Sequence, residues 1–283
     1  MHEWPLVIFT LLMQVSVGCL AVALLCHLRT GGTLRPTHAL AAMRLPLLSA
    51  FIAGALGLLA SIFHLGNPLH MFYTLTHIAS SWMSREVLVT GIYMGLLFIS
   101  VALAMLKQRL AVGILMLALL AGLVDIYVMS AIYANTLFTL WGGWFTWSGF
   151  YGSALLLGGM LTCTMVMPVL KTQGYQTEAG RVLRISLAAC GAGILLLLLS
   201  ASSLLTMVGQ PASLGITGKT LPEGLFNLSI LRVALLSLGM FTAGRLLCRN
   251  SHQRSAGAVL GLSSLCIVAA EVVGRYVFFS LGA

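Results

Sequence analysis

Charged residues are scarce in this sequence. Asp, Glu, Lys and Arg make up 7% of its 283 residues, whereas soluble globular domains carry about 25%. Hydrophobic residues account for 59% of the chain, and the mean hydropathy is +1.03. This composition excludes a water-soluble fold and indicates that lipid surrounds most of the protein surface.

The sequence also lacks the usual signatures of metal binding and of nucleic-acid binding. None of its six cysteines forms a Cys-x-x-Cys pair, and five of them fall inside apolar runs. We therefore expect small core thiols rather than an iron–sulfur cluster, a zinc site or a disulfide framework. The net charge is +9, but no dense basic patch with interleaved aromatic residues occurs, so we expect no nucleic-acid partner.

A cleavable signal peptide is not expected at the N-terminus. Residues Met1–Trp4 contain no Lys or Arg and include Glu3. The apolar run that follows, Pro5–Leu28, is longer than the hydrophobic region of a signal peptide. We interpret this run as the first membrane span.

What the sequence does contain is a series of apolar runs long enough to cross a bilayer. Backbone groups in hydrocarbon must pair within the chain, and these runs do not alternate like barrel strands, so helices are predicted. The expected spans are 5–28, 45–64, 87–106, 110–134, 149–170, 183–207, 228–247 and 257–280. Lys107, Gln108 and Arg109 alone separate two of them and predict a tight turn. The predicted fold is all-α: an integral membrane bundle of eight transmembrane helices in a single polytopic domain, 1–283.

The distribution of basic residues predicts the orientation of the chain. Eleven of the 15 Lys and Arg residues lie in or beside the loops after the first, third, fifth and seventh spans. The positive-inside rule then places both termini on the outer side. If the source is Gram-negative, this side is the periplasm, and the chain is a multi-pass protein of the bacterial inner membrane. By this scheme all the tryptophans fall on the outer side: Trp4, Trp82, Trp141, Trp144 and Trp147.

Acidic residues are rare enough to examine singly. Of the six, Glu86, Asp125 and Glu271 lie within spans or at their ends. An ionisable group at membrane depth is costly, by about 3 kcal/mol on insertion scales, and is a functional hypothesis by default. Asp125 and Glu271 lie about 14–15 residues along outward-running spans, past the midplane at about 1.5 Å per residue. His64 and Glu86 lie at the outer ends of their spans, and the inner half contains no acid.

Each of these polar residues also has a structural explanation. Glu271 and Arg275 are four residues apart on one helix and could neutralise each other. His64 could be an interfacial polar group, and Glu86 could be a charge favoured near a helix N-terminus. Asp125 could hydrogen-bond to another helix. A membrane haem would need two facing histidines at one depth, and no such pair is apparent, so we expect neither haem nor metal.

Short motifs along the whole chain resemble one family. They are His2-Glu3-Trp4-Pro5-Leu6, Phe63-His64-Leu65-Gly66-Asn67-Pro68, Ser80-Ser81-Trp82-Met83-Ser84-Arg85-Glu86 and Glu271-Val272-Val273-Gly274-Arg275. Together and in this order they resemble the membrane anchor subunit of bacterial dimethyl sulfoxide reductases and their paralogues. The resemblance runs nearly end to end and is weakest around 137–147 and 209–224.

This resemblance implies a role in anaerobic respiration. Such anchors oxidise menaquinol at the outer face of the membrane and contain no haem or metal. They pass electrons to a docked four-cluster, ferredoxin-like iron–sulfur subunit, and then to a molybdopterin catalytic subunit that reduces an S- or N-oxide. The chain would thus be the quinol-oxidising subunit of an oxidoreductase complex and would not itself catalyse the terminal reduction. By the motif match, His64 is the quinol-site histidine and Glu86 belongs to the same site.

A mechanistic hypothesis follows from these assignments. The predicted quinol-binding residues are His64, Gly66, Pro68, Arg85, Glu86 and Asp125. His64 and Glu86 are the predicted reactive pair: His64 hydrogen-bonds a quinol hydroxyl, while Glu86, together with Asp125, carries protons outward. Arg85 either pairs with Glu86 or steadies the semiquinone, and the turn around Gly66 and Pro68 shapes the mouth of the pocket.

Two other functions compete with this hypothesis. A secondary transporter would need midplane polar residues, broken helices and two related halves. Asp125 is the one membrane acid without an evident neighbour on its own helix, and no internal repeat is evident. A purely structural anchor would lack a quinol site, and it would keep quinol-driven activity after His64→Ala.

Overall fold

The computed structural model describes residues 4–62, 77–207, 223–248 and 256–282. Within these ranges the chain forms long α-helices, two short 3-10 turns and no β-strand. The 3-10 turns are η1 (Gly31–Thr33) and η4 (Thr139–Trp141). The long helices are α1 (Trp4–Thr30), α2 (Pro36–Ile62), α4 (Trp82–Leu106), α5 (Val112–Ala134), α6 (Gly143–Thr172), α7 (Gln176–Met207), α8 (Glu223–Cys248) and α9 (Ala256–Ser280).

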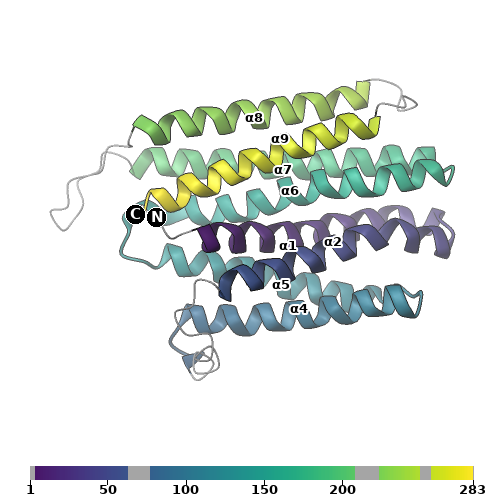
Figure 1. Cartoon of the computed structure of the whole chain (residues 1–283), viewed down its shortest axis with the longest axis horizontal. Helices are drawn as coiled ribbons and strands as arrows, with labels where there is room; N and C mark the ends of the chain where they lie inside the picture. Colours follow the sequence, from purple (N-terminus) through teal and green to yellow (C-terminus); the bar gives the residue numbers. More distant parts are fainter. Residues whose placement is uncertain (1–3, 63–76, 208–222, 249–255, 283) are drawn as a thin grey trace.

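All of these long helices lie side by side along one direction and form a bundle (Figure 1). In the described part of the chain, eight helices are long and apolar enough to cross a membrane. The prediction of an all-α membrane bundle with eight spanning helices is thereby confirmed. Several helices begin earlier than the expected spans: α2 begins at Pro36 and α7 at Gln176. The apolar runs mark the hydrocarbon section, whereas the helical hydrogen bonds continue beyond it.

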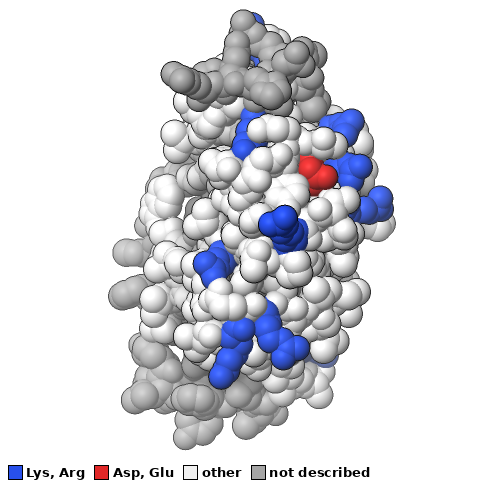
Figure 2. All heavy atoms as spheres, turned by 90° about the vertical axis from the view of Figure 1, so that its right-hand side faces the viewer, with Lys and Arg blue, Asp and Glu red and all other residues white. Residues whose placement is uncertain are grey.

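The two ends of the bundle differ in composition. The first turn of α1 and the last turn of α9 lie close together at one end of the bundle (Figure 1), here called the terminus end. Lys and Arg side chains gather on the opposite face (Figure 2), here called the basic end. The tryptophans lie at the terminus end, because Trp4 and Trp82 open α1 and α4, and the others lie in η4 and the start of α6. This end-to-end asymmetry agrees with the charge pattern of the sequence.

The predicted tight turn between the third and fourth spans is confirmed. Helix α4 ends at Leu106 and α5 begins at Val112. Gln108 has a φ of 52°, a left-handed conformation that reverses the chain. Its side-chain amide donates to the Met105 carbonyl at 2.6 Å, and Arg44 of α2 donates to its side-chain oxygen. The turn makes α4 and α5 an antiparallel hairpin.

Helices α1 and α6 form the centre of the bundle and are the most buried of the described spans. They approach closely where Gly18 faces Gly158, because a Cβ on either glycine would overlap the backbone of the other helix. Small residues that allow such contact are typical of helix packing in lipid. The α4–α5 hairpin lies on one side of α1, and the α8–α9 pair lies on the other (Figure 1).

Candidate functional site

A buried carboxyl group lies between the two helices of the α4–α5 hairpin. Asp125 of α5 is completely buried, and the hydroxyl of Thr90 on α4 donates to its Oδ1 at 2.6 Å. The two residues face each other because each lies eight or nine positions from the terminus end of its helix. Oδ2 of Asp125 is buried and has no hydrogen-bond partner among the described residues. One oxygen of this carboxyl group is therefore held in place, and the other is available.

Glu86 lies nearer the terminus end on the same face of α4. It precedes Thr90 by four residues, one helical turn, and it is half-buried. Thr90, one turn further along α4, holds Asp125 of α5, so the two acids lie on neighbouring turns of the hairpin. Ser81 caps α4 by accepting from the backbone N–H of Ser84 at 3.4 Å, which places Glu86 in the second helical turn. The structure thus brings together the two carboxyl groups that the sequence singled out.

Arg85 takes no part in this carboxyl pair. Its guanidinium donates to the carbonyl oxygens of Ile78 at 2.9 Å and Ala79 at 2.7 Å. It also lies over the ring of Trp82, with 4.3 Å from Cζ to the ring centre. Of the two roles predicted for Arg85, the pairing with Glu86 is not formed, because Arg85 instead closes the turn that leads into α4. The other role, steadying the semiquinone, stays a prediction.

Three of the predicted site residues lie outside the described residues. His64, Gly66 and Pro68 fall between the end of α2 at Ile62 and His77, where the description resumes. The helices that flank this segment, α2 and α4, meet it at the terminus end. The role of His64 and the shaping of the pocket by Gly66 and Pro68 stay predictions.

A large cavity opens in the half of the bundle nearer the terminus end. Its volume is about 720 Å³, and residues from α1, α5, α6 and α7 line it. Most of the lining is apolar, and the polar groups are few: Tyr127, Trp144, Trp147, Ser148 and Tyr151. The Tyr127 ring contacts the Trp147 ring at 4.6 Å between centres and the Trp82 ring at 6.3 Å. This aromatic row links the cavity to the first turn of α4.

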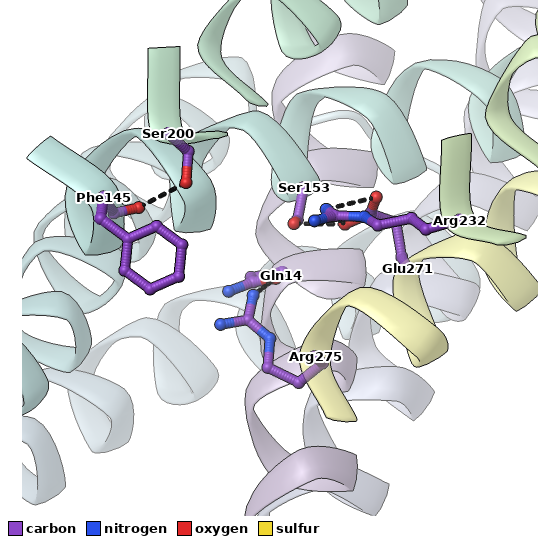
Figure 3. A network of polar contacts seen from close by, with 7 residues as sticks. All are labelled: Gln14, Phe145, Ser153, Ser200, Arg232, Glu271 and Arg275. Carbon is purple, nitrogen blue, oxygen red and sulfur yellow. Dashed lines mark hydrogen bonds and ion pairs between the residues drawn. The ribbon is translucent and has the colours of Figure 1, made fainter. Parts of the chain in front are cut away.

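A second polar cluster lies on the other side of α1 (Figure 3). Arg232 of α8 donates to both oxygens of Glu271 on α9, at 2.9 and 3.2 Å, and Ser153 of α6 also donates to Glu271. Arg275 donates to Gln14 of α1 at 2.6 Å and lies 3.9 Å above the Phe150 ring. The direct ion-pair partner of Glu271 is thus Arg232, which reaches it across the surface of α9, whereas Arg275 of the same helix interacts with Glu271 only at longer range.

Several residues of these clusters carried no signal in the sequence. Thr90, Gln14 and Ser153 are neutral, and their importance comes from the charged group that each one meets. Tyr93 and Ser16 form a further buried hydroxyl pair at 2.6 Å, one turn deeper than Thr90 on α4. Within the part of the chain that the structure describes, no three His, Cys, Asp or Glu side chains gather to hold a metal ion.

Comparison with known proteins identifies the family. The family described as DMSO reductase anchor subunit (DmsC) matches residues 1–281. The sequence is 28% identical to YnfH, an anaerobic dimethyl sulfoxide reductase protein of Escherichia coli, over 99% of this sequence and 95% of that protein. With the same coverage, it is 28% identical to an anaerobic dimethyl sulfoxide reductase subunit of Haemophilus influenzae and 26% identical to a second such subunit of E. coli. No solved structure matches it. The protein is a multi-pass membrane protein and belongs to the family of dimethyl sulfoxide reductase anchor subunits.

Proposed function

We propose that this chain binds and oxidises menaquinol near the terminus end of the bundle. It passes the electrons to an iron–sulfur subunit and then to a molybdopterin catalytic subunit, as part of a dimethyl sulfoxide reductase-type complex. The chain itself holds no haem or metal. The observation that carries the proposal is the pair of carboxyl groups, Glu86 and Asp125, at the terminus end in a family of reductase anchors.

The chemistry of quinol oxidation requires such groups. Each quinol releases two electrons and two protons, and the protons need acceptors close to the hydroxyl groups. Asp125 has one oxygen fixed by Thr90 and one without a partner among the described residues. Glu86 lies one turn nearer the surface. The two carboxyl groups form a short outward route for protons, and His64 is proposed to accept a hydrogen bond from the other hydroxyl.

The direction of this route follows from the charge asymmetry. The basic end is assigned to the cytoplasm by the positive-inside rule, so the terminus end and the docked subunits face the periplasm of the inner membrane. The described acid at the basic end is Glu178, in the first turn of α7. Electrons and protons therefore both leave toward the periplasm, and turnover moves no net charge across the membrane.

The test separates quinol oxidation from assembly. Glu86→Gln and Asp125→Asn are expected to lower quinol-driven reduction of the terminal acceptor by about 10²–10⁴-fold, the usual contribution of a general base. Reduction driven by a water-soluble dye that feeds the catalytic subunit directly should be unchanged, which shows that the complex still assembles. Glu178→Gln is the matched control. Full quinol-driven activity in both carboxyl variants would contradict the proposal and would indicate that the chain is a purely structural anchor.

A transporter receives no support from the helices. Each of the eight described spans is one continuous helix, including α2 and α6, which contain Pro46 and Pro168. Transporters with inverted repeats bind their substrates at broken helices. Solute uptake by vesicles that contain this chain without partner subunits would favour the alternative.

A further inference from the structure

The cavity between α1, α5, α6 and α7 opens to the surface of the bundle and measures about 720 Å³. Sites for drug-sized ligands measure about 300–1,000 Å³ and are mostly apolar, with a few polar groups. The lining here has that composition, so its size and chemistry fit a largely apolar organic molecule.

The lining changes from buried to exposed across the cavity. Val17 of α1 and Ile126 of α5 are completely or almost completely buried. Tyr127, Trp144 and Leu199 are 47%, 68% and 46% exposed, and they belong to α5, α6 and α7. Tyr127 and Leu199 lie seven and eight residues from the terminus ends of α5 and α7, so their exposed side chains face lipid, whereas Trp144 is the second residue of α6 and lies at the end of the bundle. A molecule that is dissolved in the membrane can therefore enter past Tyr127 and Leu199 without crossing water.

The two ends of the cavity differ in chemistry. Trp144, Trp147 and Ser148 lie in the first two turns of α6, at the terminus end, and Tyr127 lies opposite them on α5. Deeper in the bundle the lining is aliphatic, with Ala21, Leu155 and Leu196. Flat aromatic rings stack on an aromatic ligand, whereas an aliphatic lining suits a hydrocarbon chain. The occupant should carry a ring at one end and an apolar chain at the other.

The aromatic end of the cavity reaches toward the first turn of α4. The Tyr127 ring contacts the Trp82 ring at 6.3 Å between centres, and Trp82 precedes Glu86 by four residues, one helical turn. Glu86 and Asp125 do not line the cavity themselves. A ring bound against Tyr127 is therefore linked to the helical turn that carries Glu86 through the Tyr127–Trp82 contact.

From this arrangement we infer that the cavity binds the quinol, with its ring against the aromatic pair formed by Tyr127 and Trp147 and its prenyl chain along Leu155 and Leu196. The inference rests on the proposed function and adds the place and the orientation of the substrate. Tyr127, Trp147, Leu155 and Leu196 become residues that determine the affinity for quinol.

The test uses two neighbouring leucines of α7 and two substrates. Leu196 lines the cavity, whereas Leu195 is 68% exposed and does not line it. In the assembled complex, Leu196→Trp should raise the KM for prenylated menaquinol by about 10-fold or more, since misfit of even one methylene in an apolar pocket costs about 10–200-fold. The KM for menadiol, which has the same ring without the prenyl chain, should change little. Leu195→Trp should change neither constant.

Two further variants keep the inference testable. Tyr127→Leu should raise the KM for both substrates, because it removes the ring contact. If Leu196→Trp prevents assembly, as shown by loss of dye-driven activity, the smaller change Ala21→Leu replaces it with the same expectation. Unchanged KM values in the cavity variants would overturn the inference. If Glu86→Gln still lowers quinol turnover in the same complex, the proposed function stands without it. Loss of a co-purifying phospholipid in Leu196→Trp with unchanged KM would assign the cavity to lipid instead.

Discussion

Gly274→Ala is predicted to destabilise the protein by breaking an ion pair on another helix. A Cβ at Gly274 would overlap Cζ and Nε of the Arg232 guanidinium and approach its Nη1 within 2.8 Å. Arg232 must then move away from Glu271, and the bonds of 2.9 and 3.2 Å are lost. Glu271 is only 1% exposed, so it cannot recover these contacts from solvent.

The size of the effect can be estimated from the structure. Breaking a fully buried ion pair costs about 3–5 kcal/mol, whereas single interhelical hydrogen bonds in membranes contribute about 0.6–1.7 kcal/mol. The Arg232 side chain is 27% exposed, and Ser153 still donates to Glu271 after the change. Both features reduce the loss, so we expect the free energy of unfolding to fall by about 2 kcal/mol.

The assay compares two glycines of the same helix. A Cβ at Gly261 of α9 would have no atom within 4 Å, so Gly261→Ala should be neutral or slightly stabilising. Unfolding of the purified protein by SDS in mixed micelles, followed by circular dichroism, gives both free energies. Equal stability of Gly274→Ala and Gly261→Ala would refute the reasoning.

A double variant tests the mechanism rather than the loss alone. Arg232→Met removes the ion pair directly and should be destabilising by a similar amount. If Gly274→Ala acts by displacing Arg232, combining it with Arg232→Met should add little further loss, since contacting residues are not additive. Full additivity of the two effects would mean that Gly274→Ala acts elsewhere.

Three further predictions concern the site and the orientation. Thr90→Val removes the hydroxyl that donates to Asp125. It should lower the free energy of unfolding by about 1–2 kcal/mol and should also lower quinol turnover. The control, Thr242→Val at the contact between α8 and α9, should preserve quinol turnover. Quinol-driven turnover of the full complex in proteoliposomes should build no sustained membrane potential; a sustained potential would disprove outward release of both protons and electrons. Alkaline phosphatase fused after Ala283 should be active, and an inactive fusion would reverse the assigned orientation.

Local features of the chain could be predicted from its sequence. The long apolar runs predicted the spanning helices, because a helix in lipid needs only length and apolar side chains, both of which are local. The turn at Lys107–Arg109 was predicted for the same reason. The carboxyl groups of Glu86 and Asp125 were recognised as candidate site residues because charges are rare in spans. The helix ends were less accurate, since helices extend beyond their apolar sections.

Partner choice could not be predicted, because it depends on how helices are placed around one another. Spacing along α9 suggested Arg275 as the partner of Glu271, yet Arg232 lies across the helix surface and Gly274 leaves room for it. Likewise Arg85 bonds to the turn before α4 rather than to Glu86. Neutral partners such as Thr90 and Gln14 could not be recognised from any pattern in the sequence.

The sequence by itself determined that this protein is a bundle of membrane helices with a basic end, an aromatic end and a few acids within the spans. Hydrophobic length and charge act on each segment separately, so they can be read without the fold. Only the tertiary structure decided which helices wall the cavity, which oxygen of Asp125 is left without a described partner and which arginine pairs with Glu271. Those properties depend on contacts between residues far apart in the sequence, which are made once the helices pack together.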